Sequence, residues 1–101
     1  MTKADLISAM EQQGHLTHKQ AEQVVNITFE CMIKALYADD RIEIRGFGSF
    51  ANRNYKAYNG RNPKTGKVVN VEAKKVPFFK VGKELKENVD AGRDRFNIRE
   101  A

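Results

Sequence analysis

The feature that most limits how this chain can fold is a run near its middle, residues 51 to 76, that has little to bury. Its large side chains are two tyrosines and a few valines, and they are separated by basic residues. A segment of this kind gains too little from apolar burial to form part of a core. We therefore expect it to stand outside the core, and its basic residues are Arg53, Lys56, Arg61, Lys64, Lys67, Lys74 and Lys75.

A turn signal lies at the centre of this run. Asn62-Pro63 favours the start of a turn, and Gly66 can adopt the positive φ that closes one. The pattern predicts a long hairpin arm over about residues 53 to 75 with its tip here. Strands of ~10 residues at ~3.3 Å per residue would extend ~30 Å.

The first helix is predicted over about residues 3 to 13. Thr2 and Asp5 have the spacing of a capping box, in which side-chain oxygens accept hydrogen bonds from the free amides of a helix start. Gly14 suits a C-terminal cap and predicts that the helix ends before it. The helix is short and amphipathic, with an apolar stripe formed by Leu6, Ile7 and Met10.

The second helix is predicted over about residues 18 to 38, after a second capping box formed by Thr17 and Gln20. At 100° per residue its apolar residues cover well over half of the circumference, which is too wide a face for one small neighbour. We expect the helix to pack on its own domain and also on a second copy of the chain. Cys31 lies on this face, and we expect it to be a small core residue.

The remaining pattern is that of strands followed by one helix. Apolar and charged residues alternate over 41 to 45, a Gly-Phe-Gly-Ser-Phe turn follows at 46 to 50, and residues 76 to 79 resume strand character. A short helix is predicted from 82 to about 89, and a mixed-charge extension occupies about 91 to 101. The predicted fold class is α+β in one domain over residues 1 to 101, with a helical body, a three-stranded antiparallel sheet and the arm.

The charge is concentrated in one segment. The net charge is +5, but residues 1 to 40 hold 3 basic and 6 acidic side chains, while residues 51 to 86 hold 10 basic and 2 acidic ones. A cationic segment in an otherwise acidic or balanced chain indicates a polyanionic partner, and nucleic acid is the commonest one. A merely solvated basic face is disfavoured by the acidic first part.

The chain lacks the residue patterns of an enzyme, a metal site or a membrane protein. One cysteine excludes an internal disulfide, and His15 and His18 are expected in surface or cap positions because no ligand pattern surrounds them. Neither a signal peptide nor an apolar run of ~18 residues is present, so we expect a cytoplasmic protein that needs no cofactor.

The arm matches one groove of double-stranded DNA. A two-stranded ribbon has an interstrand spacing of ~5 Å, which is comparable to the ~6 Å width of the minor groove. On the residues alone, Pro63 at the tip is either a turn former only or also an apolar wedge that enters a base step.

Three segments have a distinctive pattern: residues 46 to 50, Gly60-Arg61-Asn62-Pro63-Lys64-Thr65-Gly66, and residues 76 to 83. Through these segments the chain closely resembles the HU/integration-host-factor family of bacterial DNA-bending proteins, and the resemblance extends over residues 1 to about 90. It implies an intertwined dimer whose arms wrap DNA in the nucleoid while Pro63 intercalates. The arm residues and the flank residues that it implies give the predicted DNA-binding set: Lys3, Arg41, Glu43, Arg45, Arg53, Tyr55, Lys56, Tyr58, Arg61, Asn62, Pro63, Lys64, Lys67, Lys74, Lys75, Lys80 and Lys83.

Within the family, residues 41 to 50 are similar to the β subunit of integration host factor. That similarity implies that Arg41, Glu43 and Arg45 lie at the DNA and assist sequence preference, whereas alternation alone would make them the solvent face of a strand. The alternative function is therefore a site-preferring subunit of a heterodimer in recombination and transcription. A protein-binding module whose ribbon extends a partner's sheet is a further alternative, and that partner would have to be strongly acidic.

Three features depart from the family pattern. Tyr55 and Tyr58 stand where arm arginines are usual, which keeps contact area but removes charge. Asn26 stands where HU often has an acidic partner for the residue at Lys3, so an interaction there would be a hydrogen bond. Residues 91 to 101 extend beyond the usual end of the family.

Overall fold

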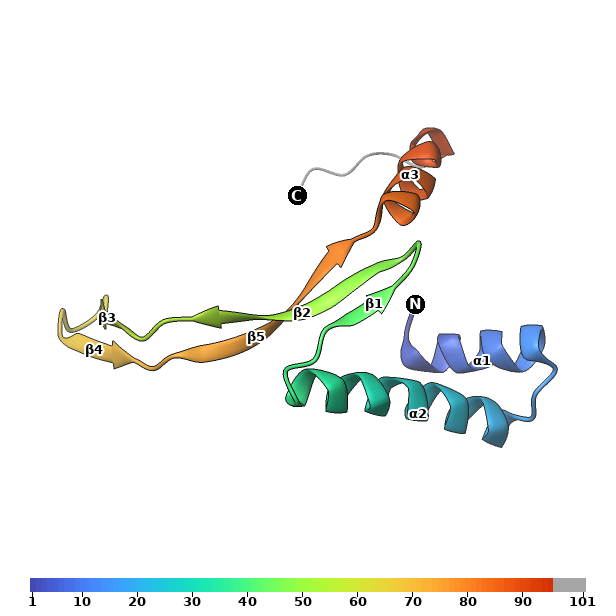
Figure 1. Cartoon of the computed structure of the whole chain (residues 1–101), viewed down its shortest axis with the longest axis horizontal. Coiled ribbons are helices and arrows are strands. Elements are labelled where there is room, and N and C mark those ends of the chain that lie inside the picture. The colour runs from blue at the N-terminus through green and yellow to red at the C-terminus, as the bar shows by residue number, and fades with distance from the viewer. Residues whose placement is uncertain (96–101) are drawn as a thin grey trace. The chain divides into compact units, whose positions relative to one another are not determined.

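The computed structural model describes residues 1 to 95, and it divides the chain into two compact units, Met1–Ala38 and Asp39–Ala101. The first unit contains two helices, and the second contains the strands and the third helix (Figure 1). Phe96 and Ile98, in the predicted C-terminal extension, lie outside the described residues. The helices and strands, in chain order, are α1 Lys3–Gly14, α2 His18–Tyr37, β1 Ile42–Ile44, β2 Gly48–Tyr55, β3 Tyr58–Arg61, β4 Val68–Val71, β5 Lys74–Val81 and α3 Lys83–Ala91, followed by a 3₁₀ turn at Arg93–Arg95.

Helix α1 begins at the predicted capping box. The amide of Asp5 donates to Thr2 Oγ1 at 3.2 Å, and the amide of Thr2 donates to Asp5 Oδ2 at 2.8 Å. The predicted end before Gly14 is wrong, because the helix includes Gly14. His15 instead adopts the left-handed conformation, with φ of 50°, and its amide donates to the carbonyl of Glu11. His15 is thus the C-cap of α1, in agreement with the predicted cap role.

Helix α2 packs on α1 through a narrow apolar stripe. It begins at the predicted box, where the amide of Gln20 donates to Thr17 Oγ1 at 3.2 Å and the amide of Thr17 donates to Gln20 Oε1 at 3.0 Å. Cys31 does not lie in the core that the chain forms by itself, because it is exposed there. Helical geometry turns it about 80° or more from the buried stripe of α2. The buried residues of the described chain are Ile7, Ala21 and Val25, with Leu6, Met10 and Leu16 packed around them.

The second unit is built on an antiparallel sheet with strand order β1-β2-β5. Strands β3 and β4 form a separate two-stranded ladder at the end of the β2–β5 hairpin (Figure 1). Both ladders share one register: Gly48 lies opposite Val81, Tyr55 opposite Lys74, and Tyr58 opposite Val71. Residues 56 and 57 interrupt the ladder opposite 72 and 73 without inserting a residue on either side. The predicted arm is therefore one continuous hairpin with a symmetric gap.

Glycines at the β1–β2 turn allow the chain to pack tightly there. Gly46 has φ of 85°, a conformation that residues with a side chain rarely adopt. A Cβ atom on Gly48 would lie 2.6 Å from the carbonyl oxygen of Lys80 on β5, so only glycine fits between these strands. The turn also anchors α3, because the amide of Gly82 donates to the carbonyl of Phe47 at 2.9 Å. Gly82 is the N-cap, and α3 ends at Ala91, two residues beyond the predicted end.

Candidate nucleic-acid interface

The tip of the hairpin is a four-residue loop held by hydrogen bonds to Asn62. The amide of Asn62 donates to the carbonyl of Lys67 at 2.9 Å, and the amide of Gly66 donates to the carbonyl of Asn62 at 2.8 Å. The side-chain oxygen of Asn62 accepts from the amide of Lys64 at 2.9 Å. Gly66 has φ of 69°, as the turn prediction required. Pro63 is exposed at the first position of this loop, which leaves its ring free to meet a partner.

The arm displays its cations without forming a core. All seven predicted basic residues from 53 to 75 are exposed, as are Tyr55 and Tyr58. Among the described residues, the carboxylate ion pairs include only one of these cations, Lys75. The arm therefore presents positive charge that its own chain leaves largely uncompensated.

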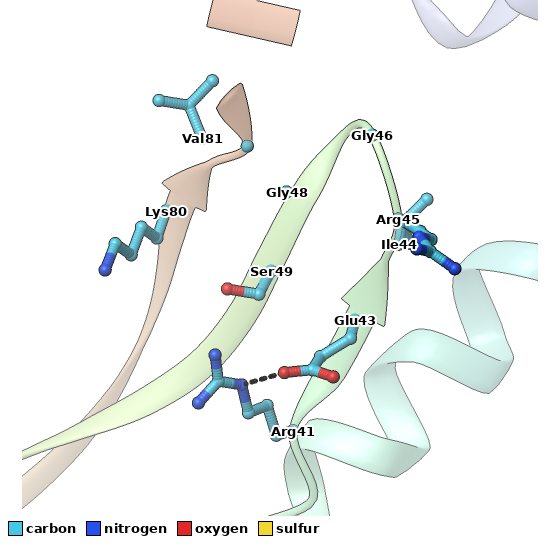
Figure 2. Close-up of a pocket in the computed structure, with 10 residues that line it drawn as sticks. Arg41, Glu43, Ile44, Arg45, Gly46, Gly48, Ser49, Lys80 and Val81 are labelled. Carbon is cyan, nitrogen blue, oxygen red and sulfur yellow. Dashed lines mark ion pairs between the residues drawn. The ribbon is translucent and has the colours of Figure 1, made fainter. Parts of the chain in front are cut away.

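A second polar surface lies on one face of the three-stranded sheet, next to the β1–β2 turn. The register aligns Glu43 on β1, Ser49 on β2 and Lys80 on β5 in one row across the strands. They line a shallow pocket together with Arg41, whose Nε lies 3.1 Å from Glu43 Oε1 (Figure 2). Figure 2 shows Arg45 at the turn, pointing away from Lys80. The structure thus brings Arg41, Glu43 and Lys80 together.

Ser49 belongs to this surface, although we did not predict it as a site residue. Its hydroxyl points to the same side as the Lys80 side chain in Figure 2. Alternation counted from the apolar Phe50 could have placed it there, because neighbouring residues of a strand point to opposite faces. The opposite face is aromatic, since the rings of Phe47 and Phe50 lie 5.4 and 4.7 Å from that of Phe79.

The base of the arm is the part where residues 51 to 55 of β2 pair with residues 74 to 78 of β5. The Asp39 carboxylate contacts one face of it, the face that carries Asn52. Asp39 Oδ1 accepts from Asn52 Nδ2 at 3.1 Å, and Asp39 Oδ2 lies 3.3 Å from Lys75 Nζ. These hydrogen bonds, first that of Asn52 and then that of Lys75, hold the pKa of Asp39 below its ordinary value. Lys75, a predicted DNA-binding residue, is thereby neutralised within the chain.

On the opposite face of the arm base, two cations lie against aromatic rings. The guanidinium carbon of Arg53 lies 3.4 Å from the centroid of Phe78. Lys74 Nζ lies 5.9 Å from the centroid of Tyr55, directly across the ladder. Neither pairing was predicted from the sequence.

The predicted flank residues lie in both units. Lys3 is exposed at the start of α1, and no hydrogen bond joins it to Asn26 within residues 1 to 95. Lys83 is exposed in the first turn of α3, with its Nζ 3.9 Å from Glu87 Oε1.

His18 lies between Glu11 and Glu22, with nitrogen to oxygen distances of 3.3 and 3.5 Å. No cluster suited to a metal ion occurs in the described part of the chain. Within residues 1 to 95, every helix is too short or too polar to cross a membrane.

Comparisons with known proteins agree with this geometry. The family described as "Bacterial DNA-binding protein" matches residues 1–90. Integration host factor subunit beta of Halorhodospira halophila is 49% identical over 100 residues, which cover 98% of both chains.

Two solved HU structures share the fold. Anabaena HU, from a cocrystal with DNA, has a TM-score of 0.80 and 39% identity, covering 88% of this chain and 97% of that one. HU from Thermotoga maritima has a TM-score of 0.62 and 27% identity, covering 88% and 98%. The α+β fold, with its three-stranded antiparallel sheet and hairpin, and the resemblance expected from the sequence are confirmed. The chain belongs to the bacterial DNA-binding family of HU and integration host factor, whose members are DNA-binding proteins and not enzymes.

Proposed function

We propose that this protein binds double-stranded DNA and bends it, with the arm lying in the minor groove. The observation that carries this proposal is the exposed, basic, two-stranded ribbon that ends at an exposed proline. Val68 and Val69 of this ribbon are exposed and so belong to no core, but they suit contact with the sugar edges of a groove. We assign the organisation of DNA in the bacterial nucleoid as its cellular role.

Pro63 acts as the wedge in this proposal. HU and integration host factor are themselves the general examples of proteins that insert apolar side chains between base pairs, so the bend is inferred from family membership. The hydrogen-bonded loop supports this assignment, because Asn62, the residue before the proline, makes three hydrogen bonds with the rest of the loop.

We infer that the functional unit is a dimer. Helix α1 covers only the central stripe of α2, and apolar residues remain exposed on both sides of that stripe. Val24 and Ile27 lie on one side and are 41% and 58% exposed, while Phe29 and Ile33 lie on the other and are 43% and 64% exposed. Apolar surface of this extent is characteristic of an interface. The family match spans both units of the chain, which supports their acting together as one domain.

The sheet surface and the flanks extend the proposed DNA path. Arg41, Glu43 and Lys80 form one polar surface, and the Arg41–Glu43 pair orients both side chains. We assign phosphate contacts to Lys3, Lys80 and Lys83, and sequence preference to Arg41, Glu43 and Arg45. These residues add to the arm, which remains the main contact.

The test separates gripping DNA from bending it. Pro63→Ala keeps every charge of the arm, so the salt dependence of binding should change little while the bend decreases. Energy transfer between the ends of a doubly labelled duplex of about 35 bp, measured at saturation, reports the bend. An equal bend for the variant and the unmutated protein would show that Pro63 is only a turn residue. Absence of duplex binding by the unmutated protein would refute the proposed function itself.

A second candidate is a site-preferring subunit that acts in a heterodimer. It is favoured by the 49% identity to an integration host factor β subunit. Sedimentation of the isolated chain, with and without the duplex, tests whether it needs a different partner. A homodimer that binds unrelated duplexes equally well would refute this candidate and leave the general DNA-bending function intact.

A further inference from the structure

The two faces of the arm base hold their cations in different ways. Lys74 and Lys75 are neighbours on β5, so their side chains leave opposite faces of the ladder. Lys75 shares its face with Asn52 and is paired with the Asp39 carboxylate. Lys74 lies on the other face, next to Tyr55, its register partner on the neighbouring strand β2. One lysine therefore has a counter-charge within the chain, and the other has an aromatic ring.

Arg53 and Phe78 lie on the same face as Lys74. The register places Arg53 opposite Val76, and Phe78 is two residues further along β5, so all three side chains share this face. The guanidinium carbon of Arg53 is 3.4 Å from the centre of the Phe78 ring, which is a stacking distance. Phe78 is 42% exposed, so its ring serves as a surface platform and not as core.

Stacking leaves the binding capacity of a cation intact. A guanidinium carries its five N–H donors in its own plane, so a ring beneath that plane uses none of them. A carboxylate partner instead occupies donors and cancels the charge, as Glu43 does at Arg41 Nε and Asp39 does at Lys75. Arg53 is therefore both oriented and free to bind a phosphate through two N–H groups.

We propose that the face carrying Arg53, Tyr55, Lys74 and Phe78 is the DNA-facing surface of the arm base, and that Phe78 and Tyr55 are positioning residues. The proposal rests on the proposed DNA-binding function and identifies which side chains orient its cations. Phe78 holds Arg53 toward the phosphates, and Tyr55 holds Lys74. Tyr55 thus contributes to binding through the lysine opposite it, although it carries no charge of its own.

The main test is a double-mutant cycle on the affinity for a duplex of about 35 bp. Phe78→Leu removes the ring but keeps an apolar side chain, and we expect it to weaken binding about two- to five-fold for each arm that contacts the duplex, the range for one exposed cation–π contact. In an Arg53→Gln background the same substitution should have no further effect, and Phe78→Tyr should bind like the unmutated protein. A purely structural role for Phe78 would give the same loss with or without Arg53, and that result would overturn the proposal.

The Tyr55 ring supplies an independent test. It is needed if the thermal midpoint of the Phe78→Leu variant shows that this variant does not fold. Tyr55→Leu should weaken binding while Tyr55→Phe should not, and the loss should disappear in a Lys74→Gln background. Lys74→Gln should also reduce the salt slope by about 0.9 per arm, a larger change than Lys75→Gln causes. Equal effects of the two lysine variants would refute the assignment of the face. If the unmutated protein does not bind the duplex at all, the proposed function itself is refuted.

Discussion

Asp39→Asn should strengthen DNA binding by releasing Lys75. Asp39 has φ of 64°, and asparagine is the substitution that best tolerates this left-handed conformation. The asparagine oxygen can still accept the hydrogen bond that Asn52 Nδ2 donates at 3.1 Å, so the loop keeps this anchor. Only the ion pair between Asp39 and Lys75 Nζ, at 3.3 Å, is removed. The variant therefore changes the charge at the arm base with little change of backbone.

The salt dependence gives the size of the effect. Each additional neutralised phosphate steepens the slope of log K against log salt by about 0.9, so one new contact per arm gives about 1.8 for a dimer. Between about 50 and 200 mM salt, the advantage of the variant should then shrink by about 3.5-fold for one contact and about 12-fold for two. The ion pair is exposed, so its own contribution to stability is small.

Fluorescence anisotropy of a labelled duplex over a salt series measures this slope. Asp40→Asn is the matched control, because it removes the same charge one residue away, and Asp40 has no hydrogen bond or ion pair in the described structure. Both substitutions reduce general repulsion of DNA, but only Asp39→Asn should steepen the slope, and Lys75→Gln should abolish that gain. Equal slopes for the two aspartate variants would refute the reasoning, because Lys75 would then be either uninvolved or already bound to phosphate.

Four further predictions concern the whole interface and the fold. Binding of the unmutated protein should neutralise about 8 to 10 phosphates and give a salt slope of about −7 to −9, whereas a slope near −2 in a filter-binding titration would exclude the arms as the main contact. The thermal midpoint should rise with protein concentration because folding and dimerisation are coupled, and a concentration-independent monomer by sedimentation would contradict this. Gly48→Ala should lower the free energy of unfolding by about 2 kcal/mol or more in a denaturant titration, because the new Cβ would meet the backbone of β5. Gly66→Ala has open space around the new Cβ, so it should lower that free energy by only about 1 kcal/mol, the cost of its positive φ. Hydrogen bonds from Thr2, above all from its backbone amide, lower the pKa of Asp5. The α1 capping box should therefore persist at neutral pH and be lost in acid as the pH falls through this lowered pKa. An NMR titration of the Asp5 carboxyl group would show this loss.

The elements that were predicted correctly depend on signals only a few residues long. Each capping box spans four residues, and the tip loop is set by Asn62 and Gly66. The prediction failed at Gly14 because helix ends depend on a single conformational choice, and here His15 adopted the left-handed state in place of the glycine. Cys31 lies outside the core that the chain forms by itself because apolar residues surround most of α2, while α1 covers only one stripe of it.

The contacts that distinguish this arm depend on pairing across the hairpin. Arg53 meets Phe78, and Asp39 meets Lys75, only because the loop from Pro63 to Gly66 has four residues and no bulge interrupts the ladder behind it. A shift of the register by one residue would move Lys75 to the face of Arg53 and Lys74 to the other face. Counting charges along the sequence therefore treats the two lysines as equivalent, whereas the hairpin register pairs one with a carboxylate and places the other over an aromatic ring. The tip loop thus determines which cations remain free to bind phosphate at the base of the arm.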